Sequence, residues 1–343
     1  MKRIIILGVL LVFFAVGLNS NTDLPSQKTR LILATATTGG TYYPVGVAIA
    51  TLVTKNLGEN AGISMTAISS AGSGENLQLL DNREADLAII QGLYGAMAWQ
   101  GRERYQGIPQ KYLRSVSILW DNVEHFVIQE KYSKSGDMSD MTNLRKKNFS
   151  IGRRGSGTEI SGRVILEGLG FNPDKDFKLK YMGYTPSAQA LQNGRISGMN
   201  IPAGPPASAI TQAYAAMGSS NLRILEFSDS HLDSVNGLFA VWRRAILKAG
   251  TYPGLDRDLA LISQPNLLVA HADIPEGVVY GIVQGLYENL EYLQNIHQAT
   301  KSMTLEKAVE GLSLPLHPGA VRYYQEKGLE IPPQLILSSL SLK

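Results

Sequence analysis

Short apolar runs alternate with longer amphipathic segments along the chain, which indicates strands alternating with helices. An apolar run at 30–35 leads through a glycine turn into a helical apolar pattern over 43–57. A second predicted strand covers 63–68 and leads into a short helix ending at Leu80, and a third covers 86–90. Alternation of this kind is typical of parallel sheets with right-handed crossovers.

The same order of elements occurs again further along. Predicted strands at 149–152, 177–182 and 197–201 are each followed by a turn and a helix. Residues 80–86 and 191–197 correspond in position, because both end a helix, turn on Asn or Gly and enter a buried strand. Two such βαβαβ units predict an α/β protein with two lobes and a ligand cleft between them.

The segments outside the two units indicate how the lobes are joined. Residues 115–130 are rich in strand formers and are expected to pass from one domain to the other, with a candidate return strand at 222–227. The remainder holds a predicted strand at 266–270 and predicted helices near 275–293 and 304–310. We expect a signal peptide over 1–20, a discontinuous first lobe of 29–121 plus 226–343, and a second lobe of 122–225.

Composition places the chain among globular proteins and argues against a nucleic-acid partner. The 343 residues can form two domains with full cores, and 44% hydrophobic with 18% charged residues makes extensive disorder improbable. Removing the first 20 residues takes Lys2 and Arg3 from the 32 basic residues, which leaves 30 against 29 acidic ones. The only short basic run is 145–147, which a surface loop explains.

The N-terminus has the pattern of a secretory signal peptide. Lys2 and Arg3 precede an apolar run over 4–18, broken only by glycine, and the chain turns polar over 19–22. An uncleaved anchor is the alternative, because no clean Ala-x-Ala site follows. The chain has no cysteine, which excludes disulfides, thiol nucleophiles and a lipoprotein anchor. We therefore expect a periplasmic protein, and a monomer.

Four small polar turns are candidate binding elements. Ligands of open parallel sheets bind beyond the carboxyl ends of the strands, where helix N-termini present free N–H groups and partial positive charge. The turns contain Gly39, Ser73, Ser156 and Ala203, two in each lobe. Each has an ordinary explanation, such as the capping box that begins at Ser156. Their matching topological places nevertheless predict that closure of the lobes surrounds one small anion.

The predicted ligand-binding residues are Gly39, Gly40, Thr41, Tyr42, Tyr43, Ser73, Asn76, Gln91, Arg154, Ser156, Gly157, Thr158, Ala203, Gly204 and Pro205. We expect one lobe to bind first through Tyr42, Asn76 and Gln91. The second lobe then closes over the ligand by hinge motion.

These segments resemble the TAXI family of TRAP-transporter solute receptors over nearly the whole mature chain. The matching motifs are GGTYYPVG at 39–46, SAGSGENL at 70–77, ADLAIIQ at 85–91, GSGTE at 155–159, AGPP at 203–206, GTYPG at 250–254 and LHPGAVRYY at 316–324. The resemblance implies a type II periplasmic binding protein fold, with two parallel-sheet lobes joined by hinge strands. It also implies capture of a small organic acid, typically of the glutamate or 2-oxoglutarate kind, for the permease subunits of a sodium-coupled transporter.

Three departures from the family pattern bear on the ligand. Residues 91–93 read Gln-Gly-Leu where Gln-Ser-Asp is usual, 198–200 read Gly-Met-Asn where an Asp-Ala pair is usual, and Arg153 and Arg154 replace small residues or proline. Fewer acids and two arginines favour a more anionic ligand such as a dicarboxylate. The alternative is that both arginines point to solvent. His125 and His317 are interpreted as structural.

The sequence lacks the motifs that the considered classes of enzyme need. Neither Ser73 nor Ser156 has the glycines of a nucleophile elbow, there is no HExxH among the five histidines, and Gly39-Gly40 does not open a GxGxxG turn. We therefore expect no catalysis, no cofactor and no metal, with an exported hydrolase as the remote alternative. A receptor of the same fold that serves an ABC importer or a signalling system is the closer alternative.

Overall fold

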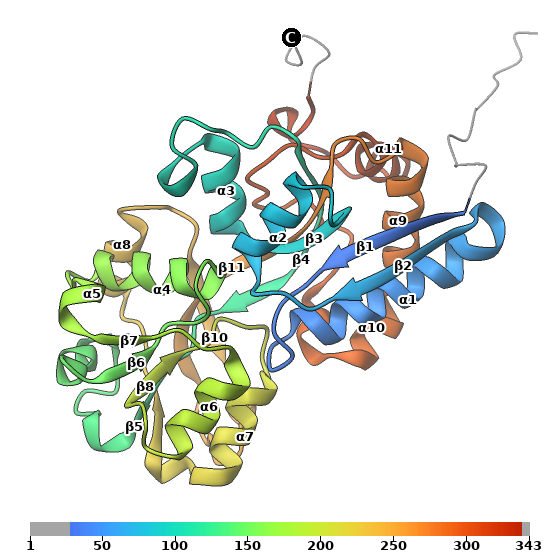
Figure 1. Cartoon of the computed structure of the whole chain (residues 1–343). Coiled ribbons are helices and arrows are strands. Elements are labelled where there is room, and N and C mark those ends of the chain that lie inside the picture. The colour runs from blue at the N-terminus through green and yellow to red at the C-terminus, as the bar shows by residue number, and fades with distance from the viewer. Residues whose placement is uncertain (1–27, 338–343) are drawn as a thin grey trace, which may run out of the picture.

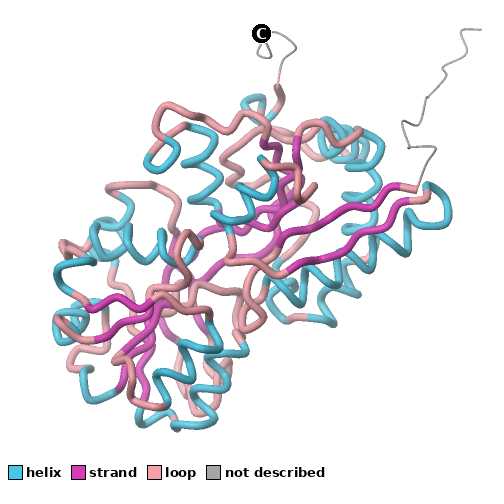
Figure 2. Tube along the Cα trace, viewed as in Figure 1, coloured by secondary structure: helices cyan, strands magenta, loops and turns pink. Residues whose placement is uncertain are grey.

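The computed structural model describes residues 28–337, so the predicted signal peptide lies outside the described residues. Within these residues the strands form two sheets (Figures 1 and 2). Helices cover each sheet, and each sheet with its helices forms one lobe. The model thereby agrees with the two-lobed α/β fold expected from the sequence. In this part of the chain no helix combines the length and the hydropathy needed to cross a bilayer.

The first sheet has the strand order β10-β11-β3-β1-β2, with β4 paired to β11. Its strands are β1 (Thr29–Ala34), β2 (Ile63–Ile68), β3 (Leu87–Gln91), β4 (Leu113–Val123), β10 (Arg243–Leu247) and β11 (Leu259–His271). Strand β1 runs parallel to β2 and β3, as the alternating pattern predicts, whereas β11 is antiparallel to β3, β4 and β10.

The second sheet has the order β7-β6-β8-β5-β9. Its strands are β5 (Phe126–Gln129), β6 (Asn148–Ser150), β7 (Lys178–Lys180), β8 (Gly198–Asn200) and β9 (Leu222–Ile224). Strand β6 is parallel to β7 and β8, and β5 is antiparallel to β8 and β9. The expected fold of two parallel-sheet lobes joined by hinge strands is therefore confirmed. The joining strands β5 and β11 enter their sheets from the opposite lobe and run against the parallel members.

The helices follow the strands closely. They are α1 (Tyr42–Ala61), α2 (Ser73–Asp81), α3 (Gly92–Gln100), α4 (Gly157–Gly168), α5 (Pro173–Asp176), α6 (Tyr184–Gln192), α7 (Ser208–Met217), α8 (Asp229–Asn236), α9 (Glu276–Glu288), α10 (Leu290–Ile296) and α11 (Pro318–Glu326). Helix α1 ends because Gly62 adopts φ 66° and its N–H bonds back to the carbonyl of Gly58.

One helix prediction near the C-terminus is wrong, and one helix there was not predicted. Residues 304–310 form turns instead of a helix, with i→i+3 bonds such as that from Ala308 to Leu305, because so short a segment does not recover the cost of helix nucleation. Helix α11, which was not predicted, begins within the motif at 316–324. Its first residue is Pro318, and the His317 side chain accepts from the Gly319 N–H.

The chain crosses between the lobes twice. The first crossing joins β4 to β5, close to the expected Asp121-Asn122. The return differs from the expected boundary at residue 226, because Phe227 and Leu259 pack in the same core as Phe126 of the second lobe. Leu268, later in β11, packs in the core of the first lobe. The second crossing therefore lies inside β11, whose first half pairs with β10.

Candidate functional site

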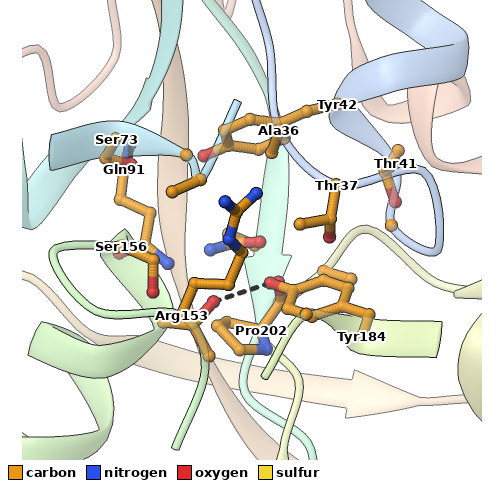
Figure 3. A pocket seen from close by; sticks show the side chains of 18 residues that line it. Ala36, Thr37, Thr41, Tyr42, Ser73, Gln91, Arg153, Ser156, Tyr184 and Pro202 are labelled. Atoms are coloured by element: carbon orange, nitrogen blue, oxygen red, sulfur yellow. Dashed lines mark hydrogen bonds between the residues drawn. The ribbon is translucent and has the colours of Figure 1, made fainter. Parts of the chain in front are cut away.

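A cavity lies at the boundary between the lobes (Figure 3). Its volume of about 30 Å³ has room for only about one or two water molecules, so the lobes are closed on one another. The lining residues are Ala36, Thr37, Gly40, Thr41, Tyr42, Ala71, Gly72, Ser73, Gln91, Asn122, Arg153, Ser156, Gly157, Thr158, Gly183, Tyr184, Pro202 and Ala203. Both lobes thus contribute, as the turn analysis predicts.

Most of the predicted binding residues reach this cavity, and some do not. Those that line it are Gly40, Thr41, Tyr42, Ser73, Gln91, Ser156, Gly157, Thr158 and Ala203. Those that do not are Gly39, Tyr43, Asn76, Arg154, Gly204 and Pro205. The sequence signals of helix starts are sufficient to predict the first group. The positions of the second group depend on how the chain is folded in three dimensions.

Two tyrosines from opposite lobes frame the cavity. The Tyr42 hydroxyl, in the first turn of α1, donates to Asn266 Oδ1 at 2.5 Å, and its ring packs edge-on against Trp120. The Tyr184 hydroxyl, at the start of α6, donates to the Pro202 carbonyl at 2.6 Å. Burial raises the pKa of both phenols, so both remain neutral donors. Sequence reasoning missed Tyr184, although it stands at a helix start that matches the other turns.

The N-terminus of α4 lies at the cavity. Ser156 Oγ accepts from the Glu159 N–H at 3.1 Å, and Glu159 Oε2 accepts from the Gly155 N–H at 2.6 Å. The first helical bond is made by Ile160, to the Ser156 carbonyl. The N–H groups of Gly157 and Thr158 precede that bond and line the cavity, so they are available to an anion.

Helix α2 of the first lobe begins opposite α4. A Cβ on Gly72 would lie 3.9 Å from the nitrogen of Gly157, and a Cβ on Gly157 would lie 2.7 Å from Ser73 Oγ and 2.6 Å from Gln91 Oε1. The last two distances are shorter than real Cβ contacts allow, so glycine at 157 permits the approach of the two helix ends. Two partial positive charges thereby converge on one small space.

Arg153, and not Arg154, reaches into the cavity. Figure 3 shows its guanidinium between Tyr42 and Tyr184. Among the described residues it has no carboxylate within 4.0 Å. Both arginines are exposed, but Arg154 does not line the cavity, and its Cζ stacks on Tyr181, 3.8 Å from the ring centroid. The two neighbouring side chains of the turn point in different directions. The arginine of the site is therefore Arg153, and the prediction of Arg154 is off by one residue.

Two buried amides in the cavity wall have polar atoms without a hydrogen-bond partner among residues 28–337. Gln91 Oε1 and both polar side-chain atoms of Asn122 make no hydrogen bond within the described part of the chain. An unsatisfied buried polar atom is costly, and each such group in a native protein calls for an explanation. A polar molecule in the cavity would supply the missing partners. The sequence marked Asn122 only as part of a strand crossing.

Asn76 does not contact the cavity, contrary to expectation. Its Nδ2 donates to the carbonyls of Thr35 at 2.7 Å and Ile89 at 2.8 Å, and its Oδ1 accepts from Ser70 Oγ at 2.6 Å. The amide is saturated by groups of its own lobe and joins the ends of β1 and β3. Asn76 is therefore structural.

Gly39 and Gly204 lie beside the cavity and join the lobes. Thr41 Oγ1 donates to the Gly204 carbonyl at 2.7 Å. The Gly39 carbonyl accepts from Ser208 Oγ and from the Ala209 N–H, each at 3.2 Å. These bonds connect the first turn of the first lobe with the start of α7 in the second. The two glycines act in lobe contact, which is a different role from the predicted ligand contact.

Two titratable side chains are buried where the chain first crosses between lobes. Glu124 accepts from Trp242, Gln264 and Asn200, each at 3.3 Å, and burial raises its pKa to about 7. His125 Nδ1 lies 3.0 Å from the Ile201 carbonyl, and burial lowers its pKa to about 4. His125 is therefore neutral and structural, as expected. In residues 28–337 no group of three or more His, Cys, Asp or Glu side chains is placed to hold a metal ion.

Solved structures with the same fold are periplasmic binding proteins. The periplasmic binding protein BugD aligns with 90% of this chain and 100% of its own at 13% identity and a TM-score of 0.52. MatC from Rhodopseudomonas palustris with bound malate aligns with 88% and 98% at 15% identity and a TM-score of 0.54. A binding protein component of an ABC phosphonate transporter from Pseudomonas aeruginosa aligns with 78% of each chain at 11% identity and a TM-score of 0.50.

At these identities the structures establish the fold alone, which is that of periplasmic binding proteins. The family is shown by the sequence comparison. The sequence model of the NMT1-like family matches residues 33–328, which span most of the chain and both lobes, and the protein therefore belongs to the NMT1-like family.

Proposed function

We propose that this protein is a periplasmic solute receptor that captures a small organic acid between its lobes and presents it to a membrane transporter. The observation that carries the proposal is Arg153, a cation without a carboxylate partner in the described chain, directed into a cavity where α2 and α4 begin. A guanidinium and two helix N-termini together favour a carboxylate. The fold supports binding without catalysis.

The ligand class follows from the polarity of the cavity lining. In the closed arrangement the cavity has room for only about one or two water molecules, so an acid enters while the lobes are apart and the polar lining indicates its class. The unpartnered amides of Gln91 and Asn122 would serve the polar groups of such an acid. We therefore propose a glutamate-like, 2-oxoglutarate-like or dicarboxylate ligand. The malate bound to MatC, a protein of the same fold, is compatible with this class.

The proposed mechanism is closure about the two strand crossings. In the first lobe Tyr42, Ser73 and Gln91 receive the acid, a set that omits the Asn76 expected from the sequence. The second lobe then brings Arg153 and the N–H groups at the start of α4 onto it. Closure removes water from these charges, which strengthens their interaction with the acid.

The proposed partner is the permease of a sodium-coupled TRAP transporter, on the strength of the motifs at 39–46 and 70–77. An ABC importer is the second candidate, because one protein of the same fold is a component of an ABC phosphonate transporter. Uptake driven by the receptor in vesicles separates the two. Dependence on a sodium gradient supports the first, and dependence on internal ATP supports the second.

The receptor function is tested by thermal unfolding of the mature protein with glutamate, glutamine, 2-oxoglutarate, malate, succinate, aromatic acids and sugars. A saturable rise in melting temperature with one acid supports the proposal, because a ligand that binds only the native state stabilises it. Mass spectrometry of the denatured protein detects an acid that co-purifies. No shift with any acid, together with no co-purified acid, would contradict it.

A further inference from the structure

Beyond the cavity, a second set of contacts joins the lobes at the mouth of the cleft. The Tyr94 hydroxyl, on α3 of the first lobe, donates to the carbonyl of Gly155 in the second lobe at 3.1 Å. Arg104 Nη1 donates to the same hydroxyl at 3.1 Å. Neither Tyr94 nor Arg104 lines the ligand cavity. Figure 1 shows α3 and α4 on facing sides of the boundary between the lobes.

The first lobe is shaped to receive this carbonyl. A Cβ on Gly74, in the first turn of α2, would lie 1.9 Å from the Gly155 oxygen and 2.6 Å from the Tyr94 hydroxyl. A side chain at position 74 is therefore incompatible with the closed arrangement. Gly74 lies in a regular helix with an ordinary backbone conformation, so glycine is needed there for the close approach of the Gly155 carbonyl and of the Tyr94 hydroxyl and not for its dihedral angles.

The chemistry of the contact suits a reversible bond. Tyr94 is fully buried, and burial raises the pKa of its hydroxyl, so the group remains protonated and able to donate. The guanidinium of Arg104 donates to the same oxygen and polarises its O–H toward Gly155. When the lobes separate, the Gly155 carbonyl loses Tyr94 and is hydrated, because the two groups belong to different lobes.

The position of Gly155 connects this contact to ligand binding. Gly155 lies between Arg153, which points into the cavity, and Ser156, which caps α4. Fixing the Gly155 carbonyl therefore fixes the turn that carries the cationic side chain and the free N–H groups. We propose that Gly74, Tyr94 and Arg104 form a latch for the Gly155 carbonyl, and that its residues set ligand affinity as positioning residues without touching the ligand.

The proposal of a latch rests on the proposed receptor function and predicts an effect on the dissociation rate of the ligand. A bond made only after closure lowers the dissociation rate and leaves the association rate unchanged. Tyr94→Phe removes one hydroxyl and keeps the ring. We expect it to raise the dissociation rate and the Kd about 3- to 10-fold, the worth of one net hydrogen bond. Tyr112→Phe is the matched control, because the Tyr112 hydroxyl donates to Leu77 within the first lobe at 2.9 Å.

The experiment uses the absence of cysteine in the chain. Spin labels are placed on Asp81→Cys and Lys178→Cys, exposed positions on opposite lobes, and their separation is measured without ligand and with glutamate, 2-oxoglutarate or malate. Stopped-flow kinetics with the same acids give the two rates. We expect Tyr94→Phe to lower the closed fraction and Gly74→Ala to abolish closure while its lobes still unfold cooperatively.

The outcomes separate the latch from the receptor. A short label distance in the unmodified chain, with Tyr94→Phe and Gly74→Ala equal to it in closed fraction and dissociation rate, would overturn the latch alone. A distance that no acid changes, with no binding of any of them, would overturn the closing receptor and the latch with it. An equal loss in Tyr112→Phe would show a general packing effect and would also overturn the latch.

Discussion

The Thr41 hydroxyl donates to the carbonyl of Gly204, 2.7 Å away, although the two residues are separated by 163 positions and belong to different lobes. Thr41 precedes α1, and Gly204 follows β8. The bond is buried, so its strength is not reduced by competing water. It shows that the first turn of the first predicted unit and the last turn of the second take part in holding the lobes together.

Replacement of Thr41 by valine tests this bond. Thr41→Val keeps the shape and leaves the Gly204 carbonyl unpaired in the closed state, which should cost about 1–2 kcal/mol of ligand affinity. Titration calorimetry with the preferred acid measures the Kd. Thr51→Val is the control, because the Thr51 hydroxyl donates to Val47 within the same helix. Equal affinity of Thr41→Val and the control would contradict the role of this bond.

The two neighbouring arginines should differ sharply. Arg153→Gln removes the cation from the cavity and should weaken binding of a dicarboxylate about 10- to 100-fold, the worth of a charged hydrogen bond. Arg154→Gln should change the Kd less than about 2-fold, because Arg154 does not line the cavity and stacks on Tyr181 at the surface. Titration calorimetry measures the Kd of both variants for the dicarboxylate. The reverse order of effects would restore the assignment of Arg154 made from the sequence.

Asn76→Ala should act on stability. The substitution leaves the buried carbonyls of Thr35 and Ile89 without their donor, and we expect the free energy of unfolding to fall by about 2–3 kcal/mol. Urea denaturation measures this. Asn82→Ala, at an exposed position, should change it by less than about 0.5 kcal/mol. A stable Asn76→Ala protein with weakened ligand binding would instead place Asn76 in the site.

Glu124 should make stability depend on pH in a defined direction. Its pKa is about 7 in the folded protein and about 4.5 in the unfolded chain, so the folded state holds the proton more tightly. Its contribution to stability is complete below pH about 4.5 and is lost as the pH rises through about 7. His125, with a folded pKa of about 4, acts in the opposite direction, losing its contribution as the pH falls below about 6.5.

The difference between Glu124→Gln and the unmodified protein isolates the carboxyl, because the contribution of His125 cancels. The free energy of unfolding of the variant, relative to the unmodified protein, should rise by up to about 3 kcal/mol between pH 4.5 and 7.5. Urea titrations at several pH values measure it. A difference that does not change with pH would show that Glu124 titrates normally in the folded protein.

Much of the fold could be predicted from local pattern. The strand predicted at 63–68 is β2, and those predicted at 30–35 and 86–90 lie within one residue of β1 and β3. The periodicity of hydrophobic residues and the capping residues at helix starts are local features, so the sequence alone reveals them. For the same reason the helix starts at Ser73 and Ser156, and the cavity lining at Gln91 and Thr158, were found without coordinates.

Local sequence patterns therefore specify the set of elements and the turns that bear the site. Tertiary structure alone decided which of Arg153 and Arg154 enters the cavity, that Asn76 is saturated within its lobe, and that β11 carries the return crossing. It also decided that Tyr94 meets Gly155. Each of these depends on packing between segments far apart in the chain, and no local propensity encodes the direction in which a side chain leaves a turn.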